Sequence, residues 1–151
     1  MIQITEHNDY TIFEDDGATH DFYCRMGRFF ASKQVVKELE GPMFDDEHYV
    51  WLLAMKDGKI AGFSSCRLDE LNKGIAHFGV TYVLPDHRRK GLYRHMFELK
   101  EQLCIKHNPA FLRGLANPLS KKVFEDRGWA TTRLAGKWTY YQKEIARVES
   151  N

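Results

Sequence analysis

The sequence predicts a single mixed α/β (α+β) domain spanning residues 1–151. A length of 151 residues is typical of one domain, and 43% hydrophobic with 28% charged residues is the composition of an ordinary globular protein. Apolar residues recur with the period of a strand in some segments and of a helix in others, and Gly, Pro and Asp turns separate these segments. The predicted order is two strands, helices, three strands, a helix, a strand, a helix and two strands.

Residues 17–41 are predicted to form two short helices. Their apolar residues recur at helical spacing, namely Phe22, Met26, Phe29, Phe30, Val35, Val36 and Leu39. Gly41 and Pro42 end the second helix, because neither residue favours its continuation.

Three strands are predicted next, over residues 48–55, 60–68 and 75–84. The first two form a hairpin, because Asp57-Gly58 between two runs rich in β-forming residues favours a tight turn. The third strand ends at Pro85. Its two faces differ, because alternate side chains point to opposite sides of a strand. One face is wholly apolar: Ala76, Phe78, Val80, Tyr82 and Leu84.

A long helix is predicted to begin after Gly91. Four apolar residues fall on one of its faces: Leu92, Met96, Leu99 and Leu103. A buried strand over residues 110–116 follows.

The last predicted elements are a helix over residues 118–127 and two strands over residues 129–134 and 137–145. Asn117-Pro118 suits the start of that helix, with Asn as the cap and Pro at the first helical position. Gly128 suits its end.

Charge is unevenly distributed on the two sides of Pro85. Residues 1–85 hold 8 Lys and Arg against 14 Asp and Glu, a net charge of −6, whereas residues 86–151 hold 14 against 7, a net charge of +7. The near-neutral total therefore consists of an acidic half and a basic half, which predicts partners of both signs.

The chain is predicted to be cytoplasmic. No segment approaches the roughly 18 apolar residues of a membrane span, and the first residues lack the basic and then apolar order of a signal peptide. Cys24, Cys66 and Cys104 are scattered and form no C-x-x-C pair, which indicates reduced thiols. His20 lies one helical turn before Cys24, but paired ligand spacing is missing, so packing rather than a metal site is predicted.

The basic segment between the third strand and the long helix is a candidate anion site. Gly91 allows the chain to turn into the helix, whose first amide groups and dipole favour a negative charge. Four cations lie within seven residues: Arg88, Arg89, Lys90 and Arg94. This arrangement suits a phosphate or pyrophosphate, and the alternative is a solvated basic helix start. Neither a Walker loop nor a G-x-G-x-x-G fingerprint is present.

Two segments resemble the signatures of the GNAT superfamily of acyl-CoA-dependent N-acyltransferases. The first family signature is V-x-P at the end of a strand, followed by [RQ]-x-x-G-x-[GA] entering a helix, and Val83, Pro85, Arg88 and Gly91 match it. Tyr93 stands where the family has a small residue. The second signature, N-x-x-A-x-x-L-Y-E-K-x-G-F, is matched less closely, by Asn117, Ser120, Val123, Phe124, Glu125, Asp126, Gly128 and Trp129. The resemblance covers about residues 46–145.

This resemblance implies a mostly antiparallel sheet with helices on both faces, and acetyl-CoA or another short acyl-CoA as co-substrate, with no metal. It places the pyrophosphate of acetyl-CoA on the amides of Arg88, Arg89, Lys90, Gly91, Leu92 and Tyr93. It places the pantetheine arm beside the backbone of Tyr82 and Val83. Asn117, Lys121 and Phe124 are expected to border the arm and the adenosine part.

His77 is the candidate general base for amide formation. It stands eleven residues before Arg88, at the offset where the resemblance to the histone-acetyltransferase branch implies a glutamate. A neutral imidazole accepts a proton near pH 7, and the alternative is a structural histidine. Phe124 replaces the tyrosine that is the family's usual general acid. Another hydroxyl, from Tyr93, Tyr140 or Tyr141, or water would have to serve, although a thiol is already a fair leaving group.

The leading hypothesis is an N-acetyltransferase that moves acetyl from acetyl-CoA to a primary amine. The acidic half favours a cationic acceptor, which is either an amine-bearing small molecule or a protein or peptide. One alternative is a catalytically impaired GNAT-like module that binds CoA, and another is a protein that binds or modifies nucleic acid through its basic half. No membrane partner is expected, and the oligomeric state is left as monomer or homodimer.

Overall fold

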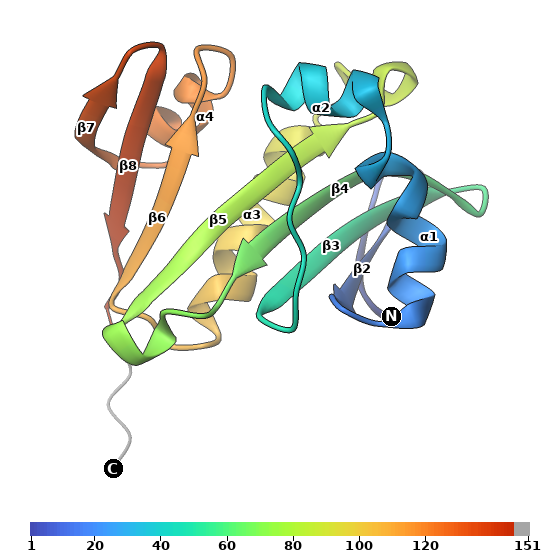
Figure 1. The fold of residues 1–151 in the computed structure, drawn as a ribbon, viewed down its shortest axis with the longest axis horizontal. Helices are drawn as coiled ribbons and strands as arrows, with labels where there is room; N and C mark the ends of the chain where they lie inside the picture. The colour runs from blue at the N-terminus through green and yellow to red at the C-terminus, as the bar shows by residue number, and fades with distance from the viewer. Residues whose placement is uncertain (147–151) are drawn as a thin grey trace. The chain divides into compact units, whose positions relative to one another are not determined.

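The computed structural model describes residues 1–146 and confirms a mixed α/β fold with an open, mostly antiparallel eight-stranded sheet (Figure 1). The strand order is β1-β2-β3-β4-β5-β6-β8-β7. The elements in chain order are β1 (Ile2–His7), β2 (Tyr10–Asp16), α1 (His20–Phe30), α2 (Lys33–Leu39), β3 (Tyr49–Lys56), β4 (Lys59–Arg67), η1 (Leu71–Lys73), β5 (Ile75–Val83), η2 (Pro85–His87), α3 (Leu92–Ile105), β6 (Phe111–Ala116), α4 (Lys121–Asp126), β7 (Ala130–Ala135) and β8 (Trp138–Glu144).

The chain divides into two compact units. The first contains residues 1–65 and 80–97, and the second contains residues 66–79 and the described chain from residue 98 to residue 146. Because β5 crosses from the second unit into the first, the segments on either side of residue 80 take part in different cores.

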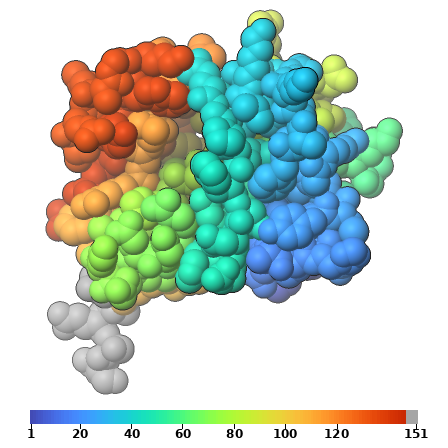
Figure 2. All heavy atoms as spheres, in the orientation of Figure 1, coloured from blue at the N-terminus to red at the C-terminus, as the bar shows by residue number. Residues whose placement is uncertain are grey.

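The first unit is built on antiparallel strands with helices on both faces. Phe22 of α1 packs against Trp51 of β3, with ring centroids 5.1 Å apart. On the other face, a Cβ placed on Gly62 would lie 3.5 Å from the side chain of Met96 in α3. The space-filling view shows α1, α2 and the segment after them, in blue to teal, on the side that faces the viewer (Figure 2).

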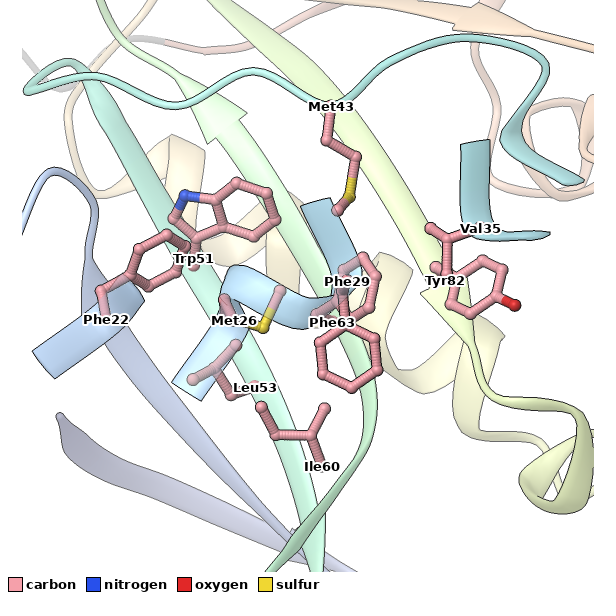
Figure 3. Packing of buried hydrophobic residues seen from close by; sticks show 10 residues of the cluster. All are labelled: Phe22, Met26, Phe29, Val35, Met43, Trp51, Leu53, Ile60, Phe63 and Tyr82. Carbon is pink, nitrogen blue, oxygen red and sulfur yellow. The ribbon is translucent and has the colours of Figure 1, made fainter. Parts of the chain in front are cut away.

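The core of the first unit lies between α1 and the strands β3 and β4 (Figure 3). Its members are Phe22, Met26, Phe29, Val35, Met43, Trp51, Leu53, Ile60, Phe63 and Tyr82. The two helices are capped as their sequences favour. Thr19 accepts a hydrogen bond from the amide of Phe22 at 3.1 Å, and Ser32 accepts one from the amide of Val35 at 3.2 Å.

The second unit is a smaller sheet packed against α4 and the last turns of α3. β5 runs parallel to β6, whereas β8 pairs antiparallel with both β6 and β7. Its core contains the aromatic side chains of Phe78, Phe124, Trp129 and Tyr141. It also holds a buried carboxylate, Glu101, which pairs with Arg127 and Lys143 at 2.7 Å each.

Most predicted elements are confirmed to within two residues, including the tight turn at Asp57-Gly58, where both φ angles are positive. The helix predicted over residues 118–127 is shorter than expected and begins at Lys121. The cause is Asn117, whose carboxamide oxygen accepts hydrogen bonds from the amides of Leu119 and Ser120 at 3.1 and 3.0 Å. These hydrogen bonds stabilise a turn at the residues that were predicted to form the first turn of the helix.

None of the helices within residues 1–146 is both long enough and apolar enough to cross a membrane.

Candidate functional site

The segment between β5 and α3 presents a row of backbone amide groups. It begins with the short helix η2, after which Arg89 and Gly91 both have positive φ angles, of 63° and 79°. In the described part of the chain, the amides of Arg89, Lys90, Gly91 and Leu92 donate to no protein acceptor. The first amides of α3 and the positive end of its dipole add to this row, so the segment is suited to an anion with several oxygen atoms.

The side chain of Arg88 is exposed but is held by contacts with neighbouring groups of the protein. Its Nε donates to the carbonyl oxygen of Val83 at 2.9 Å, and its Nη2 donates to the carboxylate of Glu38 in α2. This hydrogen bond is the main reason that the pKa of Glu38 is lowered. The guanidinium also lies 5.4 Å from the ring centroid of Tyr82. Arg88 therefore joins the segment to the end of β5 and to α2.

Arg89 and Lys90 keep their side chains exposed. Within residues 1–146 neither side chain has an ion-pair partner. The positive charges of these two side chains are therefore not compensated by a carboxylate of the described residues. Arg94 is also exposed, and Tyr93 is half-buried.

A second contact to the same segment comes from β2, near the start of the chain. The hydroxyl of Tyr10, a buried residue of β2, lies 2.9 Å from Nδ1 of His87. Sequence analysis found neither Tyr10 nor Glu38, because both are ordinary residues of predicted elements and only their long-range partners give them a role.

Tyr82 and Val83, expected beside a pantetheine arm, are buried at the end of β5. The hydroxyl of Tyr82 donates to Glu38 at 3.3 Å, and burial raises the pKa of this tyrosine. The backbone of Leu84 just after them is held by the carbonyl of Ala61 at 2.9 Å. The strand end that leads into the amide row is therefore held in place by side chains and backbone alike.

His77 occupies the last residue pair of the parallel ladder between β5 and β6. The paired residues are Ile75 with Phe111, Ala76 with Leu112 and His77 with Arg113. The Nε2 atom of His77 lies 2.9 Å from Oε1 of Glu70. Burial lowers the pKa of His77, although Glu70 acts in the opposite direction. The imidazole is therefore neutral near pH 7 and available as a proton acceptor.

Glu70, like Tyr10 and Glu38, was not singled out from the sequence. Its hydrogen bond to His77 lowers the pKa of the carboxyl group, so Glu70 is ionised. Lys73 and Arg67 lie 3.5 and 3.6 Å from its carboxylate. A carboxylate bound to one imidazole nitrogen fixes the orientation of the ring. Acidic residues of a loop before a strand are common, so the sequence did not single out Glu70.

Phe124 is a core residue of the second unit. Its ring stacks on Tyr141 with centroids 4.9 Å apart and an angle of 6°, and its edge meets Trp129. It also lies against the backbone of Gly114, where a Cβ atom would come within 2.6 Å of the ring. Beside it on α4, Lys121 is half-buried and has no ion-pair partner within residues 1–146.

Tyr141 and Tyr140, two candidates for the replacement acid, both contact charged side chains. The hydroxyl of Tyr141 donates to Glu125 at 3.0 Å, and the residue is buried, which raises its pKa. Tyr140 points to the opposite face of β8, where the guanidinium of Arg133 lies 4.3 Å from its ring centroid. A raised pKa makes Tyr141 a weaker proton donor than an ordinary tyrosine.

A family model for an acetyltransferase (GNAT) domain matches residues 11–137 of the chain. The chain belongs to the GNAT acetyltransferase family. A search of curated proteins gave no match. The GNAT match covers the amide row, His77 and the segment that begins at Asn117.

Solved structures with the same fold include several acyltransferases. The ribosomal-protein-S18-alanine N-acetyltransferase from Escherichia coli is 17% identical, with a TM-score of 0.67, over 94% of this chain and 97% of that one. An acyl-CoA N-acyltransferase from Pseudomonas aeruginosa is 14% identical, with a TM-score of 0.67, over 91% of this chain and 99% of that one. The N-acetylglutamate synthase from Neisseria gonorrhoeae, solved with coenzyme A and N-acetyl-glutamate, is 11% identical, with a TM-score of 0.60, over 90% of this chain and 35% of that one. At these identities the likeness shows the GNAT fold alone.

Proposed function

We propose that this GNAT protein transfers an acetyl group, or another short acyl group, from acyl-CoA to a primary amine. The observation that carries the proposal is the amide row from Arg89 to Leu92, which donates to no protein acceptor in the described residues. The row includes two exposed cations, Arg89 and Lys90, and leads into the start of α3. Backbone amides in this arrangement bind pyrophosphate without sequence-specific side chains. A family member solved with coenzyme A adds support.

His77 serves as the proton acceptor in this proposal. Amines bind protons near neutral pH, and only the neutral form attacks a carbonyl carbon. The neutral imidazole removes one proton from the amine, directly or through water, while Glu70 holds the ring and stabilises the charge that forms on it. The C–N bond forms as the C–S bond of the thioester breaks, so one acyl group moves from sulfur to nitrogen.

Release of the thiolate does not require a general acid at position 124, where this chain has Phe124 in place of the family's tyrosine. An ordinary thiol has a pKa of about 8.5, so the thiolate is a fair leaving group near neutral pH. Water, or the hydroxyl of the half-buried Tyr93, supplies the proton that completes the thiol. The proposal therefore uses His77 as base and assigns no proton transfer to Phe124.

Two measurements on the purified chain test this function. Calorimetric titration with CoA measures binding, and release of free CoA thiol from acetyl-CoA measures turnover with a panel of primary amines. Binding together with amine-dependent thiol release supports the proposal. Binding without release for any amine would establish the alternative of a CoA-binding module, and absence of CoA binding would overturn both.

The nucleic-acid alternative makes a different prediction. A protein that binds nucleic acid through its basic half shows affinity for DNA or RNA that falls steeply with salt. Among the basic residues of this half, Arg88, Arg127 and Lys143 are engaged in internal ion pairs. This leaves less positive charge for phosphate groups than the composition suggests, so we favour the acyltransferase.

Three carboxylates of the acidic half have internal partners. Asp15 pairs with Arg25 at 3.0 Å, and Asp45 accepts hydrogen bonds from the indole of Trp51 and the amide of Ala18 at 2.9 and 2.8 Å. Glu38 pairs with Arg88. Two of these contacts are ion pairs with arginine, so they compensate only part of the acidic charge of this half.

A further inference from the structure

One face of the sheet in the second unit carries polar and cationic side chains. Strand register places two rows on it, since paired residues of neighbouring strands point to the same side. The first row is His77, Arg113 and Gln142, and the second is Leu115, Tyr140 and Arg133. We refer to these six residues as the Arg113 face.

The opposite face of the same strands is the core face. It carries Gly114 and Tyr141, which pack under Phe124 of α4. In Figure 1, α4 lies behind β6 and β8. Figure 2 shows the other side of these strands, in orange and red, open to the viewer. Both Arg113 and Leu115 are exposed, the latter by 45%. The Arg113 face is therefore accessible to a ligand.

Arg113 is oriented by a neutral partner. Its Nε donates to the carboxamide oxygen of Gln142 at 3.0 Å. Within residues 1–146 no carboxylate pairs with it. Because this hydrogen bond uses one edge of the guanidinium, the terminal N–H groups keep the forked arrangement that binds a carboxylate with two parallel hydrogen bonds.

Arg133 is held in a similar way. Its guanidinium lies 4.3 Å from the ring centroid of Tyr140, and it also lacks an ion-pair partner in the described residues. β7 and β6 are separated by β8, so the two arginines are about 10 Å apart across the strands. Glu144 is the carboxylate that register places on the same side, beside Phe111, and Glu70 is engaged with His77. The face therefore carries excess positive charge.

From this arrangement we infer that the Arg113 face binds the carboxylate of the acceptor, so that the acceptor is an amino acid or another amine that bears a carboxylate. The inference rests on the proposed function, in which His77 receives the proton of the acceptor amine. His77 and Arg113 are direct neighbours on adjacent strands, which are about 5 Å apart. An amine beside the imidazole and a carboxylate on the guanidinium are then separated by a short chain of atoms, as in an amino acid.

Kinetics with matched acceptors test the inference. Each of the twenty amino acids is compared with its C-terminal amide, which keeps the amine and lacks the carboxylate, and spermidine serves as a purely cationic amine. Rates are expressed per concentration of neutral amine, because amidation changes the pKa of the amine. We expect kcat/KM to be at least about tenfold higher for the best amino acid than for its amide, the ratio that 1.4 kcal/mol produces.

Variants assign this preference to the face. In R113Q, kcat/KM for the amino acid falls about tenfold, mainly through a higher KM, whereas kcat/KM for the amide is unchanged. R133Q has a smaller effect in the same direction. The matched control is K122Q, which removes an exposed cation on α4 that pairs with Asp126. Circular dichroism and thermal unfolding confirm that each variant is folded.

Equal rates for amino acid and amide, a preference for spermidine, or an unaltered preference in R113Q overturns the inference while the acyltransferase stands. If no amine is acylated at all, the proposed function fails. Binding measurements then test the Arg113 face independently of acyl transfer. Calorimetric titration with N-acetyl amino acids and their amides then shows whether the wild type binds the carboxylate form more tightly and R113Q does not. Absence of this difference overturns the inference.

Discussion

The guanidinium of Arg88 pairs with the carboxylate of Glu38, which lies fifty positions earlier in the chain. Gln34 and Tyr82 donate hydrogen bonds to the same carboxylate, at 2.9 and 3.3 Å. Glu38 of α2 thereby holds the residue that precedes the amide row, while the side chains of Arg89 and Lys90 remain exposed. The conformation of the candidate anion-binding segment thus depends on a helix that carries none of the family's signature residues.

Replacing Glu38 by Gln is expected to weaken both folding and CoA binding. The pair is partly exposed, so its loss should cost about 1 kcal/mol of unfolding free energy. CoA affinity should fall by roughly threefold to tenfold, because the amide row loses its anchor. Urea unfolding and calorimetry measure the two effects, and Glu47→Gln, an exposed carboxylate elsewhere, serves as the control. Additive effects of Glu38→Gln and Arg88→Gln in the double variant would show that the two residues are not coupled.

Replacing Gly91 by Val should abolish CoA binding. Gly91 has a φ angle of +79°, and a left-handed conformation costs a residue with a Cβ about 1–2 kcal/mol. A valine would leave this conformation and turn the neighbouring amides away from a bound anion. Gly58→Val is the matched control, because Gly58 has a φ angle of +74° in the β3–β4 turn. Both variants should lose stability, but CoA affinity should fall at least about tenfold only in Gly91→Val. Unchanged affinity in Gly91→Val would contradict the assignment of the amide row.

The pH profile of acyl transfer should report the ionisation of His77. Its pKa is lowered by burial, so the rate per neutral amine should be constant at neutral pH and fall only below about 6.5, as the imidazole becomes protonated. Glu70 raises the pKa of His77, so Glu70→Gln should move this midpoint to still lower pH and reduce kcat through loss of ring orientation. His77→Gln should lower kcat by about 10²–10⁴-fold. A profile that His77→Gln does not alter would assign the imidazole a structural role.

Replacing Gly114 by Ala should destabilise the second unit. The added Cβ would lie 2.6 and 2.9 Å from two ring atoms of Phe124, and stacking on Tyr141 prevents that ring from moving away. Overpacking of this kind costs about 1–3 kcal/mol. The cost measured by urea unfolding should be smaller in a Phe124→Leu background. Gly27→Ala in α1, where no atom lies within 4 Å of the new Cβ, should instead stabilise the protein by about 0.5–1 kcal/mol.

Thiol titration should distinguish the three cysteines. Cys24 is exposed, whereas Cys66 and Cys104 are fully buried. A hydrogen bond to Cys66 and burial raise the pKa of Cys104 well above its usual range. In the native protein one equivalent of an aromatic disulfide reagent should react rapidly, and the other two should react only on unfolding. Cys24→Ser should remove the rapid phase, and a second rapid equivalent in the wild type would show that the buried pair opens.

The sequence predicted most helices and strands because their determinants are local. The spacing of apolar residues predicted α1, α2 and α3, and Asp57-Gly58 predicted the hairpin. α4 was predicted too long, because the competing turn at Asn117 also consists of local hydrogen bonds and the two outcomes look alike in sequence. The candidate anion segment was found for the same local reason, since Gly91 and its basic neighbours lie next to one another.

Residue roles that depend on distant partners were decided by the tertiary structure. Nothing in the sequence distinguished Arg88, which pairs with Glu38, from Arg89, which has no ion-pair partner within residues 1–146. Lys100 of α3 is fully buried, its Nζ lies 3.3 Å from the carbonyl oxygen of Gly79, and burial lowers its pKa to about 8.

His77 was found from local sequence, whereas the roles of Glu70 and Arg113 became evident only from the tertiary structure. The strand pattern and the family resemblance identified His77, whereas its hydrogen bond to Glu70 and its pairing with Arg113 follow from a turn and from strand register. Local sequence determines which conformation a segment prefers, because propensity and periodicity act over a few residues. The charges that meet in space are determined by how strands and helices pack, and packing joins residues that the chain keeps far apart.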